Sequence, residues 1–146
     1  MKLSHVTALT LLAVICLPCA GAEQQGSSVR ETSHNPSSAL FTTPLQDIPG
    51  KQLVVVGLEF KPNPSHTAMT PHRHPGSVYV YVTRGTARLG IEGQPVQVVH
   101  TGESFFEPPG ALHTVAESAS ETESATAIAV MIVPNGAPLL TVEPHK

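Results

Sequence analysis

The amino-acid sequence predicts an all-β domain, a sandwich or barrel of short strands. Its apolar residues fall in short runs rich in Val, Ile, Tyr and Phe. Segments containing Pro or Gly divide these runs at intervals of roughly 8–12 residues. No longer stretch combines a helical period of apolar residues with good helix formers. At 146 residues, the chain is expected to form one domain.

Breaker segments such as KPNPS, TRG, EGQP, HTGE and PPGA mark where each expected strand ends. The strands are expected at residues 53–60, 77–84, 86–93, 95–100, 104–107 and 125–134. A further strand should open at His113, after the turn PPGA. Residues 117–125 (ESASETESA) are expected to form a long surface loop, and LLTVE near the C-terminus could add an edge strand.

The N-terminal residues 1–22 are expected to be a signal peptide. Lys2 precedes an apolar stretch, and Ala20 to Ala22 has the small residues at which signal peptidase cuts. The alternative is an N-terminal helix of the core. Residues 23–40 are polar and are expected to be a flexible segment before a domain at 41–146. The mature protein is therefore expected in the periplasm or outside the cell.

Cysteine and charge narrow the possible functions. Cys16 and Cys19 both lie in the expected leader, so a mature chain would have no disulfide and would bind a metal through nitrogen and oxygen atoms. The formal net charge of −3 and the lack of a basic stretch argue against nucleic acid and against a membrane surface. A small molecule is the expected partner, with a homodimer as an open possibility.

Three histidines near Pro/Gly bends are the candidate site. His72 and His74 lie two residues apart where a strand begins, so their side chains should share a face. His113 follows the turn PPG, and it can face the same interior if its strand pairs with residues 77–84. Three neutral imidazoles would then form a facial set for a divalent first-row ion, with positions left open for water or a ligand.

The same segments resemble the two motifs of the cupin superfamily. The first motif, G-x5-H-x-H-x(3,4)-E-x6-G, is matched by His72, His74 and Gly85. Its leading glycine is absent, and Val78 stands where the motif has glutamate.

The second motif, G-x5-P-x-G-x2-H-x3-N, is matched at four positions and has Glu117 in place of asparagine. The matching residues are Gly102, Pro108, Gly110 and His113. More narrowly, the chain resembles small single-domain bacterial cupins, several of them exported.

This resemblance implies a double-stranded β-helix, a jelly-roll-like barrel that is often dimeric and holds one metal. The implied ligands are His72, His74 and His113. Fe, Ni, Cu, Zn and Mn all remain candidates for the ion. Because Val78 cannot bind a metal, the ion would keep its 2+ charge and up to three open positions, unless another residue supplies a fourth ligand.

Strand alternation assigns the residues around the expected ligands to two faces. If His72 and His74 point inward, Val78, Val80 and Val82 should also point inward, with Tyr79 and Tyr81 outward. Arg73 should point away from the metal. Glu59 is expected to face solvent.

Glu107 is the one candidate for a catalytic residue. It could be a fourth ligand, a hydrogen-bond acceptor for a ligand imidazole, or a general base, but a charged residue at the rim is the favoured interpretation. His66 is a minor candidate for a fourth ligand. Otherwise His66 is interpreted as a surface or loop residue, and so are His34, His100 and His145.

The expected function is an exported cupin that binds one divalent metal. If it is an enzyme, a metal-dependent dioxygenase acting on a small chelating substrate is the first hypothesis. A non-catalytic periplasmic module for a small ligand or metal is the second, and a metal-dependent isomerase or lyase of sugar acids is the third. Because imidazole must be neutral to bind a metal, affinity is expected to fall as the pH drops through roughly 6.5.

Overall fold

The computed structural model describes residues 39–65 and 67–143 of the chain. The described residues form ten β-strands and no helix. Accordingly, this part of the chain has no helix that is long and apolar enough to cross a membrane. The expected signal peptide, His34, His66 and His145 all lie outside the described residues.

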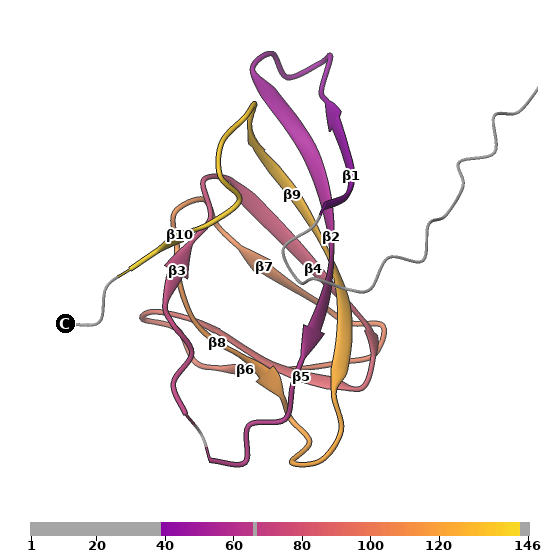
Figure 1. Ribbon diagram of the computed structural model, residues 1–146, viewed down its shortest axis with the longest axis vertical. Helices are drawn as coiled ribbons and strands as arrows, with labels where there is room; N and C mark the ends of the chain where they lie inside the picture. The colour runs from indigo at the N-terminus through magenta and orange to yellow at the C-terminus, as the bar shows by residue number, and fades with distance from the viewer. Residues whose placement is uncertain (1–38, 66, 144–146) are drawn as a thin grey trace, which may run out of the picture. The chain divides into compact units, whose positions relative to one another are not determined.

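Two antiparallel five-stranded sheets make up the domain (Figure 1). The first has the order β1-β2-β9-β4-β7, with β1 at Ala39–Pro44, β2 at Lys51–Phe60, β9 at Ala125–Pro134, β4 at Ser77–Arg84 and β7 at Ser104–Glu107. The second has the order β10-β3-β8-β5-β6, with β10 at Thr141–Val142, β3 at His72–Arg73, β8 at Leu112–Ser118, β5 at Thr86–Ile91 and β6 at Gln97–His100. The prediction of an all-β fold is confirmed.

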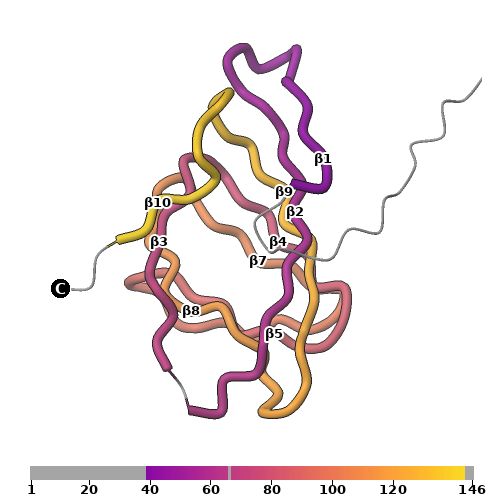
Figure 2. Tube along the Cα trace, in the orientation of Figure 1, coloured from indigo at the N-terminus to yellow at the C-terminus, as the bar shows by residue number. Residues whose placement is uncertain are grey.

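The long strands β2 and β9 run side by side through the first sheet (Figure 2). The second sheet is built mostly from shorter strands, and its β3 and β10 form one edge of it. Figure 2 shows β10, near the C-terminal end, beside β3, the strand that carries His72.

Alternating side chains on each strand form the core. On β4, Val78, Val80 and Val82 are at most 2% exposed, while Tyr79 and Tyr81 are 45% and 41% exposed. This is the alternation that the sequence predicts, and β9 repeats it with a buried residue at every second position. The valines pack with buried side chains from β2, β5 and β9 into one apolar cluster.

The strand that carries His113 has different neighbours from those expected. β8 pairs with β3 and β5, not with β4, whose partners are β7 and β9. Local sequence shows that residues 113–115 favour a strand, but it does not identify the strand beside it. The expected loop at 117–125 is shorter than predicted, because β8 extends to Ser118 and β9 begins at Ala125.

The tail forms the short edge strand β10, which pairs with β3. Arg73 points away from the histidines, as expected, and secures this edge. Its Nε donates to Glu143 at 2.8 Å and its Nη1 donates to the carbonyl of Gly110 at 2.6 Å. The ion pair is about 40% exposed, so its main effect is to position the segment, with a contribution to stability of about 1 kcal/mol or less.

A glycine permits the close packing of the chain between His74 and β4. Gly76 is buried, and a Cβ there would collide with the backbone carbonyl of Ile132 on β9. The segment after the histidines therefore lies directly against the backbone of β9. This close approach helps to fix where β3 and β4 diverge into different sheets.

Candidate metal centre

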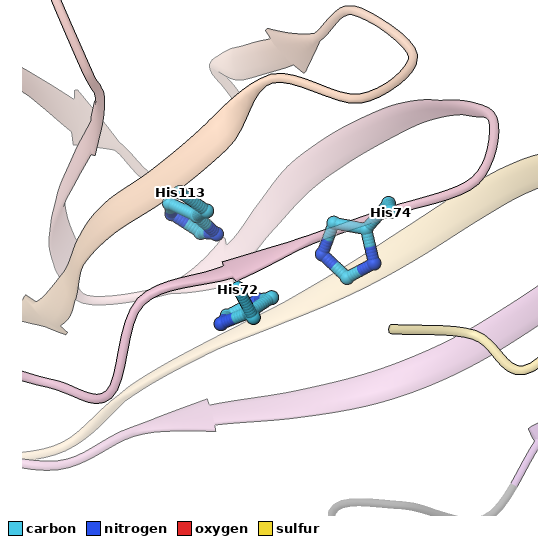
Figure 3. Close-up of side chains that lie close together, drawn as sticks. All are labelled: His72, His74 and His113. Atoms are coloured by element: carbon cyan, nitrogen blue, oxygen red, sulfur yellow. The ribbon is translucent and has the colours of Figure 1, made fainter. Parts of the chain in front are cut away.

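Pairing between β3 and β8 brings the three histidines together. His72 lies directly opposite His113 in the register of these strands, and His74 follows β3 immediately. The ring centres are 4.9 Å apart for His72 and His74, 5.2 Å for His72 and His113, and 6.5 Å for His74 and His113. One nitrogen from each ring lies within 4.8 Å of the other two, and Figure 3 shows the rings gathered around a common space.

Backbone carbonyls orient the three rings. His74 Nδ1 lies 2.6 Å from the carbonyl of Leu139, and His113 Nε2 lies 2.9 Å from that of Val115. A longer contact of 3.4 Å joins His72 Nδ1 to the carbonyl of Thr70. Because a carbonyl can only accept a hydrogen bond, these contacts assign the proton to the contacting nitrogen of each neutral ring. The nitrogens left with a lone pair are Nε2 of His72, Nε2 of His74 and Nδ1 of His113.

Glu107 belongs to the same group. It is only 2% exposed, and its Oε2 lies 3.3 Å from His113 Nδ1 and 3.7 Å from His74 Nε2. The interpretation of Glu107 as a charged rim residue is therefore wrong. β7 turns Phe105 and Glu107 inward and leaves Phe106 55% exposed.

Burial shifts the pKa values of these groups in opposite directions. It raises the pKa of Glu107 from 4.5 to about 7, because an ionised carboxylate loses its hydration. It lowers the pKa of His113 from 6.5 to about 4, with a further decrease from the neighbouring His72. The pKa of His74 is lowered mainly by burial, against the opposing effect of its bond to Leu139. His74 and His113 are thus neutral at pH 7, the form that binds a metal.

Two buried side-chain atoms in this site have no hydrogen-bond partner. Across residues 39–65 and 67–143, the buried side-chain polar atoms that lack a hydrogen-bond partner are Glu107 Oε2 and His113 Nδ1. Buried polar atoms are nearly always paired in proteins, so each exception needs a cause. Here two lone-pair-bearing atoms face each other, which is unfavourable unless a proton or a cation lies between them. The donor set of imidazole nitrogens and a carboxylate oxygen fits a divalent transition metal.

The histidines open onto a cavity of about 480 Å³. Its polar side chains are the three histidines and Glu107, and the rest of the lining is apolar. The apolar lining includes Val56, Phe60, Val80, Leu89, Met131 and Leu139. A volume of this size is in the range of small-molecule sites, which lie roughly between 300 and 1,000 Å³.

The family profile for the cupin domain matches residues 58–131, more than half of the chain. The chain belongs to the cupin family. This match spans all three histidines and Glu107, so the site described above lies inside the cupin domain. A search of the curated proteins gives no match.

Two solved structures with TM-scores above 0.5 show the same fold. A protein with a double-stranded β-helix domain from Klebsiella pneumoniae is 21% identical, with a TM-score of 0.52 over 80% of this chain and 91% of the other. Oxalate decarboxylase is 19% identical, with a TM-score of 0.51 over 64% of this chain and 24% of the other. A cupin-like protein from Thermotoga maritima is 26% identical, with a TM-score of 0.43 over 56% of each chain. This cupin therefore spans about half of the Thermotoga protein and a quarter of the decarboxylase.

Among the residues that the structure describes, Glu59, His100 and Glu117 were also singled out in the sequence and lie outside the metal centre. Glu59 and His100 are exposed. Glu117, which replaces the motif asparagine, accepts hydrogen bonds from Arg88 at 2.9 Å and from Asn63 at 2.6 Å. These contacts join the loop after β2 to β5 and β8, and they make Glu117 a structural residue of this cupin.

Proposed function

We propose that this cupin binds one divalent transition-metal ion through His72, His74 and His113, and uses it on a small substrate with an oxygen-bearing end and an apolar body. The observation that carries the proposal is the convergence of three imidazole nitrogens, all within 4.8 Å of one another, in the lining of a mainly apolar cavity. Neutral imidazoles are the form that Fe, Ni, Cu, Zn and Mn all accept, so the choice of ion is left to measurement.

When bound, such an ion would supply Lewis acidity and, if it is redox-active, electrons for oxygen chemistry. The protein residues have separate tasks. The carbonyls of Leu139 and Val115 hold two of the rings in position. The apolar wall excludes water around the substrate. Before an ion binds, burial raises the pKa of the Glu107 carboxyl group to about 7, so this group is partly protonated near neutral pH.

The cavity wall favours one substrate class over another. A sugar acid presents many hydroxyl groups, each of which would need a hydrogen-bond partner once buried. Among the described residues, the side chains that could supply such partners in this cavity are the three histidines and Glu107, which form one cluster. A compact, mainly apolar molecule with one or two oxygen donors, such as a diketone or a phenol, matches the lining better. This supports a dioxygenase over a sugar-acid isomerase or lyase.

The first experiment measures metal content by mass spectrometry, on untagged protein purified without chelators. Near one equivalent of iron, copper or nickel would support oxygen chemistry, whereas zinc would favour a Lewis-acid or binding role. His113→Ala should lose the metal. Unchanged metal affinity in this variant would refute the three-histidine site.

Oxygen consumption separates the enzyme from a non-catalytic binding module. The metal-loaded protein should consume oxygen with candidate diketones, thiols or phenols, and the His113→Ala variant should not. Binding of the same compounds without oxygen uptake would favour the non-catalytic module. Turnover in the absence of oxygen would favour the isomerase or lyase.

We also propose that the chain is exported after cleavage behind Ala22, which would place the site in the periplasm or outside the cell. The support is the leader pattern of residues 1–22, with its positive start, apolar stretch and small residues at the cleavage position. A homodimer stays an open proposal, to be tested by the mass of the purified protein in solution.

A further inference from the structure

We propose that Glu107, on β7, is the fourth protein ligand of the metal. It would supply the carboxylate that the first motif places on β4, where this chain has Val78 instead. This inference rests on the proposed metal site. It concerns how many protein atoms coordinate the ion and what charge the site carries.

The strand register is the first support. Glu107 on β7 lies directly opposite Val78 on β4, the position where the first motif has glutamate. Residues directly opposite in an antiparallel pair point to the same face, with Cβ atoms about 4.5–5.5 Å apart. Val78 and Glu107 are both 2% exposed and both line the cavity. A carboxylate at 107 therefore starts one strand away from the motif position and points into the same space.

The distances are the second support. With bonds of about 2.0–2.2 Å, two ligand atoms of one ion lie about 3.0 Å apart in adjacent octahedral positions and about 3.4 Å apart in a tetrahedron. Glu107 Oε2 lies 3.3 Å from His113 Nδ1 and 3.7 Å from His74 Nε2, close to these spacings. The histidine nitrogens lie up to 4.8 Å apart, which is wider. Because His72 has only the weak 3.4 Å contact with Thr70, its ring is the one expected to move toward the ion.

The third support is charge. Within the described part of the chain, the basic side chains within 4 Å of the Glu107 carboxyl group are the neutral His74 and His113, and none is a Lys or Arg. A buried carboxylate without a cation is strongly unfavourable. Its Oε2 is one of the two buried atoms without a hydrogen-bond partner, and the other, His113 Nδ1, faces it. A single divalent ion would satisfy both atoms.

A fourth ligand changes what the site can accept. Three neutral imidazoles would leave the ion with its full 2+ charge, whereas the added carboxylate lowers the charge of the centre to 1+. An octahedral ion would keep two positions for outside ligands instead of three. The centre then suits one bidentate, singly charged ligand end, with the apolar body in the cavity.

The test uses Co²⁺ as the probe, because its visible absorption reports the number and type of ligands. Glu107→Gln keeps the size of the side chain and removes its anionic oxygens. We expect Co²⁺ affinity to fall by more than about 100-fold, beyond the 10–100-fold typical of a residue that only orients a ligand, and the visible bands to change. Glu92→Gln is the matched control: it removes the same charge at an exposed turn and should bind Co²⁺ like the wild type.

The outcomes separate this inference from the site on which it rests. If His113→Ala loses Co²⁺ but Glu107→Gln keeps wild-type affinity and bands, Glu107 is not a ligand and the three-histidine site stands. A fall of 10–100-fold with unchanged bands would also refute ligation, because Glu107 would then act only through a histidine. If His113→Ala binds normally, the metal site itself is wrong.

Infrared difference spectroscopy on the wild type provides a measurement that needs no variant. Adding Zn²⁺ to the metal-free protein should shift the stretching bands of one buried carboxyl group. The absence of any carboxyl signal on loading would overturn the proposal, even if Glu107→Gln failed to fold.

Discussion

Replacing Glu107 with Gln should make the metal-free protein progressively more stable than the wild type as the pH rises. Between pH 4.5 and about 7, an unfolded carboxyl group has lost its proton while folded Glu107 still holds it. The folded state then binds more protons, so the free energy of unfolding of the wild type falls with increasing pH. Gln has no such proton, so the difference between the two proteins grows over this range.

The structure sets the size of this effect. A pKa of about 7 in the folded chain against 4.5 in the unfolded chain corresponds to about 3 kcal/mol, at about 1.4 kcal/mol per pH unit. Burial is its cause, and Glu107 is 2% exposed, so little solvent screening reduces it. His113, with its pKa lowered to about 4, acts in the opposite direction as the pH falls below 6.5. This contribution is common to both proteins.

Urea unfolding, followed by circular dichroism between pH 4.5 and about pH 8, measures the difference. A chelator keeps both proteins free of metal, since a bound ion would stabilise the ionised carboxylate. Glu92→Gln, at an exposed turn, serves as the control and should track the wild type at every pH. A constant difference between Glu107→Gln and the wild type would refute the reasoning, because the carboxyl group would then not be desolvated in the folded state.

Three further predictions concern the metal, the backbone and the leader. Metal affinity should fall as the pH drops below about 7, because the metal competes with the proton on Glu107, and protonation of His113 should add to the loss only near pH 4. Isothermal titration at several pH values measures this affinity, and an affinity that is flat between pH 5 and 8 would contradict the prediction. Gly76→Ala should destabilise the fold by about 3 kcal/mol, because its Cβ meets the carbonyl of Ile132. An unchanged melting temperature would contradict this, because the chain could then move away from β9 there at little cost. Mass spectrometry of the exported protein should find a chain that begins directly after Ala22, and an intact N-terminus would argue for the alternative of an N-terminal helix.

Much of the fold follows from local patterns. The alternation of Val and Tyr on β4 identifies both its strand character and its buried face, because only one face of the strand can be apolar throughout. His72 and His74 are two residues apart, so their common direction is also a local property. The spacing of the second motif around PPG points to His113 in the same way.

The burial of Glu107 could not be predicted from local sequence patterns. In the stretch SFFE, either Phe105 or Phe106 could face the core, and the choice decides whether Glu107 is buried or exposed. Alternation cannot resolve two adjacent apolar residues. Pairing of β7 with β4 resolves them, because it aligns Phe105 with Val80 and Glu107 with Val78 on the buried face.

The sequence by itself determined most of the strands, the inward face of β4 and the three histidines, since each depends on neighbours only a few residues apart. It did not predict β1, whose first residues, Ala39 and Leu40, were expected in the flexible segment. Tertiary structure alone decided which strand lies beside His113, which carbonyls orient the rings and that Glu107 joins the site. The orientation of the His74 ring depends on the carbonyl of Leu139, and the inward direction of Glu107 depends on the pairing of β7 with β4. These contacts join segments distant in the chain, so they exist only once strand pairing and burial have set the register of both sheets.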